Sequence, residues 1–154
     1  MRITIVAVGK LKEPYWRDAA AEYLKRLGSY ATVRVVEVAD RDLARGEEQA
    51  RAAEAEDLLR SLPAGAHVVA LDSAGRSVTS EAFADWIGSC GLDGRSHLTF
   101  VIGGSAGLAT EVLGRADDRI SLGAMTLPHQ LARVVLLEQV YRGFRILRGE
   151  PYHR

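Results

Sequence analysis

Residues 121–154 read SLGAMTLPHQLARVVLLEQVYRGFRILRGEPYHR, and this stretch does most to decide the fold. A short strand-like segment, residues 120–122, leads into an apolar loop, residues 123–128, and a long helix is expected from Leu131 to Leu147. The chain then ends on Pro151-Tyr152-His153-Arg154. An aromatic ring, an imidazole and a guanidinium are suited to holding a nucleobase and its phosphate, whereas a terminus usually carries nothing costly. The tail is therefore predicted to belong to a functional site.

The composition is that of an ordinary globular protein. The chain has 154 residues, of which 47% are hydrophobic and 26% charged, and one domain spanning residues 1–154 is expected. No run of 18 apolar residues is present, so no membrane span is expected, and the short apolar start does not resemble a signal peptide. The single Cys90 excludes an internal disulfide and a multi-cysteine metal site. Together these features indicate a cytoplasmic protein without a membrane partner or a bound metal.

Charge is unevenly distributed although the net charge is zero. Residues 40–60 contain seven acidic residues and four arginines, whereas residues 133–154 contain five arginines and two glutamates. A small basic patch near the C-terminus is compatible with RNA contact, and it is equally compatible with a solvated helix face.

Apolar periodicity alternates between strands and helices along the whole chain. Strands are expected at residues 2–8, 33–38, 67–71, 98–102 and 119–122, and helices at residues 13–27, 47–62, 80–89, 110–116 and 131–147. A turn is expected at residues 73–75, and Ser80 is expected to cap the third helix. This alternation predicts an α/β fold with a mostly parallel sheet and helices on both faces.

The last predicted helix is apolar on more than one side. A helix of this kind must be buried on two sides. One side is expected to face the sheet and the other a second copy of the chain, since two-fold homodimers are the commonest assembly. Deep burial within one monomer is the alternative.

Three loops follow the carboxyl ends of predicted strands: residues 71–73, 103–107 and 123–128. Ligands of open α/β sheets bind at this edge, so the loops are expected to form one pocket. Gly103 and Gly104 allow a ligand to approach backbone amides closely. Apart from Asp72 the loops carry no strong charge, which suits an apolar ligand such as an adenine ring.

Gly103-Gly104-Ser105-Ala106-Gly107 also matches the G-x-S-x-G nucleophile elbow of serine hydrolases. Asp117, Asp118, His129 and His153 follow in the order of a hydrolase triad. The chain is short for that fold and has no upstream oxyanion segment, so a hydrolase using Ser105 is an alternative hypothesis.

Several segments together resemble the ribosomal RNA large subunit methyltransferase H family of the SPOUT class. The resemblance extends from end to end and is most specific in Ile102-Gly103-Gly104, Thr126-Leu127-Pro128-His129 and Pro151-Tyr152-His153. It is also carried by Val6-Ala7-Val8-Gly9-Lys10, Glu22-Tyr23-Leu24-Lys25-Arg26, Leu71-Asp72, Leu92-Asp93-Gly94-Arg95, Gly107-Leu108, Ser121-Leu122, Ala132-Arg133, Glu138-Gln139 and Tyr141-Arg142. The sequence departs from relatives at Ser105-Ala106 and within residues 40–60.

The resemblance implies a C-terminal trefoil knot, an exception to the usual absence of knots, and a homodimer with S-adenosylmethionine in the knot. By position, the implied cofactor-binding residues are Leu71, Asp72, Gly103, Gly104, Leu122, Gly123, Ala124, Met125, Thr126, Leu127 and Pro128.

The implied reaction is methylation of N3 of a pseudouridine in 23S rRNA on assembled ribosomes. The imide proton must leave, and His129 or His153 is a candidate base because histidine titrates near neutrality. Arg142 is expected to stabilise the imide anion and Tyr152 to stack on the base. A non-enzymatic ribosome-binding factor is a further alternative.

Overall fold

The computed structural model describes residues 1–152. Its strands are β1 (Arg2–Val8), β2 (Thr32–Val38), β3 (His67–Ser77), β4 (His97–Ile102) and β5 (Asp118–Ser121). Its helices are α1 (Pro14–Leu27), α2 (Glu47–Arg60), α3 (Ser80–Leu92), α4 (Thr110–Arg115) and α5 (His129–Leu147), with a short 3-10 helix, η1 (Leu43–Arg45), before α2. Each predicted strand and helix is present, with ends displaced by a few residues.

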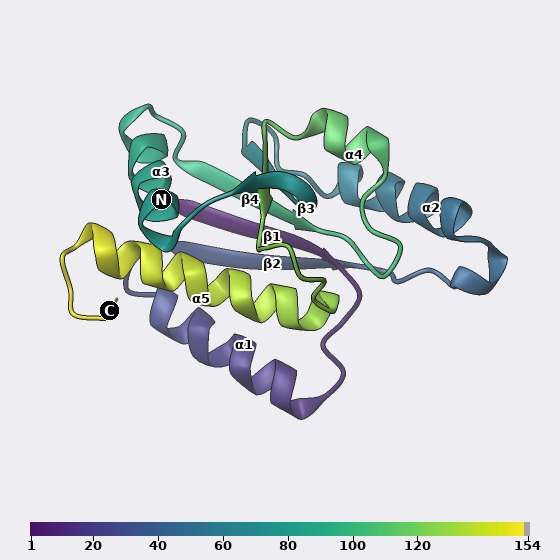
Figure 1. Cartoon of the computed structure of the whole chain (residues 1–154), viewed down its shortest axis with the longest axis horizontal. Helices are drawn as coiled ribbons and strands as arrows, with labels where there is room; N and C mark the ends of the chain where they lie inside the picture. Colours follow the sequence, from purple (N-terminus) through teal and green to yellow (C-terminus); the bar gives the residue numbers. More distant parts are fainter. Residues whose placement is uncertain (153–154) are drawn as a thin grey trace.

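The five strands form one sheet in the order β2-β1-β4-β3-β5, and every neighbouring pair is parallel. Helices α1, α3 and α5 cover one face, and α2 and α4 cover the other (Figure 1). The predicted α/β fold with helices on both faces is confirmed. Because all strands run in one direction, their carboxyl ends meet at one edge of the sheet.

Alternate residues of each strand build two separate cores. In β1, Ile3 and Ile5 point into the core beneath α1, α3 and α5, whereas Val6 and Val8 point into the core beneath α2 and α4. All four side chains are almost fully buried. Burying such a side chain stabilises the fold by about 1.5–3 kcal/mol. Because β1 is buried on both faces, its sequence is a nearly continuous apolar run and does not alternate with polar residues.

Strand β3 continues through the segment where a turn was expected. Leu71 and Arg76 both pair with Ile120 of β5, so residues 72–75 form a bulge inside the strand. A Cβ atom on Gly75 would lie 2.8 Å from the backbone of Arg119 and Ile120. The prediction of a turn at residues 73–75 was wrong, because pairing with β5 resumes at Arg76. Only glycine fits at position 75, where the backbones of β3 and β5 approach each other closely.

The cap of α3 is Thr79 and not Ser80. The Thr79 hydroxyl accepts a hydrogen bond from the Ala82 amide at 3.1 Å. The Ser80 hydroxyl instead donates to Gln139 Oε1 at 2.6 Å, which ties α3 to α5.

Helix α5 packs against both α1 and α3. Leu136, Leu137 and Val140 are almost completely buried, whereas Val134 and Val135 are only partly buried. The apolar second side is therefore not fully covered within one chain. In the part of the chain that the structure describes, no helix is long and apolar enough to cross a membrane.

Candidate functional site

A cavity of about 600 Å³ lies at the carboxyl edge of the sheet, where the three predicted loops converge. This volume is within the range of small-molecule and cofactor sites. Ten of the eleven residues expected there line the cavity: Leu71, Asp72, Gly103, Gly104, Leu122, Gly123, Met125, Thr126, Leu127 and Pro128. Ala124, the eleventh, is not among the residues that line it. The rule that ligands sit beyond the strand ends locates this cavity.

The glycine loop, residues 103–108, forms one wall of the cavity and is closely packed on its other side. A Cβ atom on Gly103 would lie 2.8 Å from the Gly107 backbone, and one on Gly104 would lie 3.0 Å from Val8 Cγ1. The Gly107 amide donates to the Gly104 carbonyl at 3.0 Å, and Gly107 has a φ of +76°. A side chain at Gly104 would push the loop away from β1, and one at Gly103 would open the loop at Gly107, so the glycines set the position of the wall.

The loop between β5 and α5 forms the opposite wall. The Ser121 hydroxyl donates to the Gly123 carbonyl at 2.9 Å and accepts from the Gly123 amide at 3.1 Å, which fixes the first turn of this loop. Met125 lines the cavity yet is 86% exposed. Its flexible thioether side chain therefore stands at the cavity mouth, where it is available to contact a ligand.

His129 is the first residue of α5 and lines the same cavity. Its Nε2 atom lies 3.5 Å from the Cβ position of Gly9, whose φ is +87°. Arg133, one turn later, donates to the Gly9 carbonyl at 2.9 Å and to Glu37 Oε2 at 2.6 Å. These contacts hold the start of α5 against the end of β1 and place an imidazole in the cavity wall.

Arg142 and Tyr152 come together at the other end of α5. Arg142 donates to Glu138 Oε1 through Nε at 3.0 Å and Nη2 at 2.5 Å, and the Tyr152 hydroxyl donates to the same oxygen at 3.3 Å. The hydrogen bond to Glu138 raises the pKa of the Arg142 guanidinium. Burial, and then the charge of Glu138, raises the pKa of the Tyr152 phenol. The result is a charged guanidinium and a neutral phenol held side by side.

Within one chain this pair lies far from His129. Arg142 follows His129 by 13 residues in one helix, which places their Cα atoms about 20 Å apart. The four residues expected to act together, His129, Arg142, Tyr152 and His153, are therefore not brought together in one chain, and His153 lies outside the described residues. The helix predicted at residues 131–147 already implied this separation, because it begins two residues after His129 and contains Arg142.

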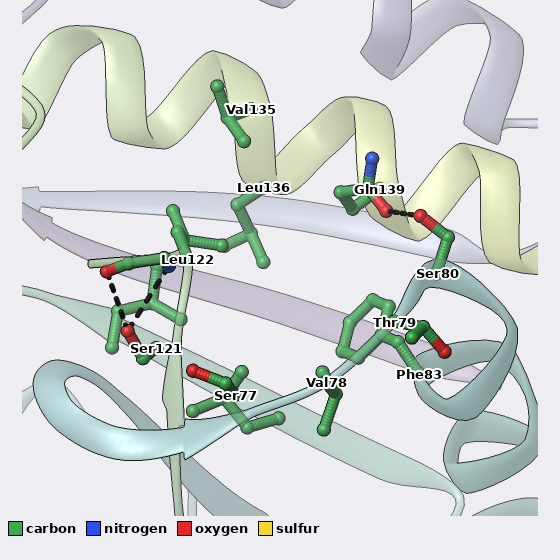
Figure 2. Close-up of a pocket in the computed structure, with 13 residues that line it drawn as sticks. Ser77, Val78, Thr79, Ser80, Phe83, Ser121, Leu122, Val135, Leu136 and Gln139 are labelled. Atoms are coloured by element: carbon green, nitrogen blue, oxygen red, sulfur yellow. Dashed lines mark hydrogen bonds between the residues drawn. The ribbon is translucent and has the colours of Figure 1, made fainter. Parts of the chain in front are cut away.

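A second, smaller hollow adjoins the cavity on the α3 side (Figure 2). It has a volume of about 220 Å³ and shares Leu71, Ser121, Leu122 and Gly123 with the larger cavity. Phe83, Val135 and Leu136 give it an apolar wall, and the Ser80–Gln139 hydrogen bond closes one end. Sequence reasoning missed this hollow because its wall is built from α3 and α5, which are distant in the sequence.

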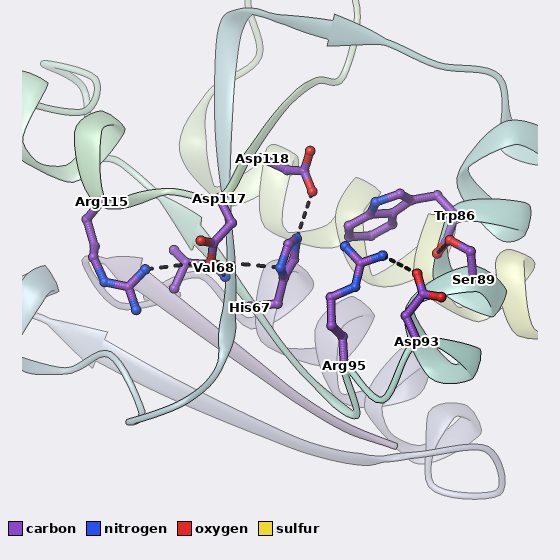
Figure 3. A network of polar contacts seen from close by, with 9 residues as sticks. All are labelled: His67, Val68, Trp86, Ser89, Asp93, Arg95, Arg115, Asp117 and Asp118. Atoms are coloured by element: carbon purple, nitrogen blue, oxygen red, sulfur yellow. Dashed lines mark hydrogen bonds and ion pairs between the residues drawn. The ribbon is translucent and has the colours of Figure 1, made fainter.

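The residues of the hydrolase hypothesis are not assembled. Ser105 lines the cavity and is exposed, but Asp117 and Asp118 lie at the opposite, amino edge of the sheet. There Asp118 Oδ2 is 2.7 Å from His67 Nε2, and Asp117 accepts from the Val68 amide at 2.8 Å (Figure 3). Among residues 1–152 no histidine is hydrogen-bonded to the Ser105 hydroxyl. The G-x-S-x-G match is therefore part of the glycine loop and does not form a nucleophile elbow.

Other cavity-lining residues were missed although they adjoin predicted ones. They are Ile102, Leu108, Ser121, Gln130 and Ala132, whereas Ser73, Ser105 and Gly107 belong to the predicted loops. Their position beside the predicted loop residues was the available signal.

Comparison with known proteins places the whole chain in one family. The family model described as a predicted SPOUT methyltransferase matches residues 1–153. The protein named ribosomal RNA large subunit methyltransferase H from Carboxydothermus hydrogenoformans is 51% identical, and the one from Listeria monocytogenes serotype 4a is 52% identical. In both cases the match covers 100% of each chain.

Solved structures show the same fold at low sequence identity. A probable methylase family protein from Haemophilus influenzae Rd KW20 has a TM-score of 0.57 and 15% identity, over 99% of this chain and 70% of that one. A structure described in terms of 2-OH methylation of C/U34 on tRNA has a TM-score of 0.53 and 19% identity, over 97% and 98% of the two chains.

Proposed function

The chain belongs to the SPOUT methyltransferase family, and we propose that it uses S-adenosylmethionine to methylate N3 of a pseudouridine in 23S rRNA. Relatives covering the full chain are named as large-subunit rRNA methyltransferases. The observation that carries the proposal is the convergence of three loops on one cavity of about 600 Å³. The other parts of the proposal follow from what the residues around this cavity can do.

The cavity suits S-adenosylmethionine in size and chemistry. Gly103 and Gly104 leave backbone amides open to close approach, and Leu71, Leu122 and Leu127 supply apolar surface for an adenine ring. When bound, the cofactor supplies an electrophilic methyl group on a sulfonium. In this proposal Leu71, Asp72, Gly103, Gly104 and residues 122–128 hold it.

The acceptor N3 must lose a proton before or during attack on the methyl group. His129 is the described histidine that lines the cavity, and we assign it as a candidate base, with His153 as the other. A neutral imidazole has one ring nitrogen that accepts a proton, so either side chain is suited to this role.

Arg142 and Tyr152 are assigned to the nucleotide. The guanidinium is suited to an imide anion or a phosphate, and the phenol ring is suited to stacking on a base. Since they lie about 20 Å from His129 within one chain, the site is completed only if the tail of one copy reaches the cavity of another. We therefore propose a homodimer, in which the half-buried side of α5 contacts the partner.

The RNA substrate and the cellular setting follow from the same assignment. The arginine-rich residues 133–154 supply positive charge, and recognition of the assembled ribosome would rely largely on shape. An enzyme acting on ribosomes works in the cytoplasm. We further propose the trefoil knot of the family, on the basis of the match to the family over residues 1–153.

Titration calorimetry with S-adenosylmethionine tests the proposal first. We expect saturable binding at about one cofactor per chain, followed by methyl transfer to ribosomes from a strain that lacks this enzyme. The modified base is identified by mass spectrometry of the 23S rRNA. A folded protein that binds ribosomes but neither binds the cofactor nor transfers methyl groups would instead be a ribosome-binding factor.

A further inference from the structure

A buried carboxyl group lies directly behind the glycine loop. Glu54 of α2 is 3% exposed, and both of its carboxyl oxygens lie 3.4 Å from the Cβ position of Gly104. Oε2 accepts a hydrogen bond from the Arg41 amide at 3.0 Å. Within residues 1–152, Oε1 is buried without any hydrogen-bond partner. An acid in this position costs folding free energy, so its presence requires an explanation.

The charged groups around Glu54 compensate its charge only in part. Asp40, on the connection after β2, adds a second carboxyl, and the Arg41 guanidinium is paired with Asp57 at 2.5 Å. Burial, and then Asp40, raises the pKa of Glu54, while the hydrogen bond from the Arg41 amide and, less strongly, the charge of the Arg41 guanidinium lower it. The net direction is upward.

The cavity side of this group is also free of compensating charge. The glycine loop, residues 103–108, carries no charged side chain. From α5, His129 approaches Gly9, next to Asp40. The wall of the cavity at Gly104 is therefore backed by Glu54, while Asp40 and the imidazole of His129 lie beside Gly9.

We propose that Glu54 is a specificity-determining residue that makes this wall favour a cationic ligand, the sulfonium form of the cofactor, over the neutral thioether left after methyl transfer. The inference rests on the proposed function. The two ligands differ by one methyl group and one positive charge, so shape alone separates them weakly. A carboxylate in a poorly hydrated interior acts across the intervening backbone of Gly104 more strongly than it would in water. The wall then helps to retain the substrate and release the product.

Binding and ionisation of Glu54 are reciprocally linked. If the ionised carboxyl favours the cation, the cation must favour ionisation of the carboxyl to the same extent. Sulfonium binding is therefore expected to release a proton from Glu54, and neutral thioether binding is not. The preference for the sulfonium is expected to grow as pH rises, because a larger fraction of Glu54 is then ionised.

The test is calorimetric titration of S-adenosylmethionine and S-adenosylhomocysteine into the whole protein and into Glu54→Gln. We expect the substitution to weaken sulfonium binding about fivefold and leave thioether binding within about twofold. Titrations in buffers of different ionisation enthalpy should show proton release with the sulfonium ligand only, and its loss in the variant. Glu56→Gln is the matched control, since Glu56 is on the same helix with a 78% exposed side chain.

Each outcome is decisive. If Glu54→Gln changes both affinities equally, or neither, the residue is structural and the inference is wrong, while the proposed function stands. If the unmodified protein binds neither ligand, the proposed function itself fails. Should the variant not fold, the ratio of the two affinities is measured against pH in His129→Gln, which removes the imidazole from the cavity wall: a rise with pH supports the inference, and a flat ratio overturns it.

Discussion

The Cζ atom of Arg142 lies 4.7 Å from the centre of the Tyr152 ring, and both side chains donate to the same oxygen of Glu138. Neither residue lines the cavity at the carboxyl edge of the sheet. Tyr152 also packs against Tyr141 in an edge-to-face arrangement at 4.9 Å. The aromatic contact fixes Tyr152 at the end of α5.

We expect Arg142→Ala and Tyr152→Ala to lower turnover on ribosomes much more than cofactor affinity. Loss of a group that stabilises developing charge costs about 10²-fold in rate, and loss of a stacking ring costs about 1–3 kcal/mol in RNA binding. Cofactor binding should stay within about twofold because neither residue lines the cavity. Methylation assays and calorimetry on the same preparations measure both quantities, and parallel losses in the two would refute this division of roles.

Gly104→Ala should weaken cofactor binding by about tenfold or more. The added methyl group would lie 3.0 Å from Val8 Cγ1 and 3.4 Å from the Glu54 carboxyl oxygens. The glycine loop must then move toward the cavity, because the β1 side is fully packed. Gly114→Ala is the control, since a Cβ atom there meets nothing within 4 Å. Equal affinities of the two variants, measured by calorimetry, would contradict this packing argument.

The fold was predictable from sequence because apolar periodicity reports each strand and helix separately. The cavity was predictable because ligands of parallel sheets bind beyond the carboxyl ends of the strands. Residues 2–8 read as a buried strand, and the loops at Gly103 and Leu122 follow strands whose carboxyl ends must meet in a parallel sheet. The bulge at residues 72–75 was not predictable in this way, because Ser73-Ala74-Gly75 has turn composition and only pairing with Ile120 shows that the strand resumes.

Glu54 shows where more could have been extracted from the sequence. Helix α2 is rich in alanine, glutamate and arginine, and its sequence was not used to separate buried from exposed acids. Yet Glu54 is four residues from both Ala50 and Leu58, which are buried. Residues at this spacing share one helix face, so the position of Glu54 on the buried side was available from spacing alone.

The buried ion pair between Arg133 and Glu37 should respond unequally to the removal of each partner. The Arg133 side chain is 4% exposed and that of Glu37 is 33% exposed, with 2.6 Å between them. Glu37→Ala leaves a buried guanidinium without its counter-charge and should cost about 3 kcal/mol. Arg133→Met leaves a carboxylate that water can reach and should cost less. Urea unfolding measures both, and a larger loss in Arg133→Met would show that packing outweighs charge here.

His97 should make the protein less stable in weak acid. Its Nε2 atom lies 2.9 Å from Thr4 Oγ1, and burial, followed by the charge of Arg2, lowers the pKa of His97 from 6.5. Between the two pKa values the unfolded chain binds a proton that the folded chain does not. The free energy of unfolding should therefore fall as pH drops below about 6.5. His97→Gln should remove this part of the slope, which urea unfolding at about pH 7.5 and about pH 5.5 measures. A constant difference between the two proteins would contradict the assignment.

Mixing two inactive variants tests whether the site is shared between copies. His129→Ala damages the cavity wall, and Tyr152→Ala damages the tail about 20 Å away in the same chain. If each site takes His129 from one copy and Tyr152 from the other, a mixed dimer has one site with both defects and one intact site. Random exchange of equal amounts should then restore about a quarter of the unmodified activity on ribosomes. If both residues serve the site of their own chain, every site in a mixed dimer keeps one defect and no activity returns. Light scattering of each variant before mixing is the control, since exchange requires that both remain dimers.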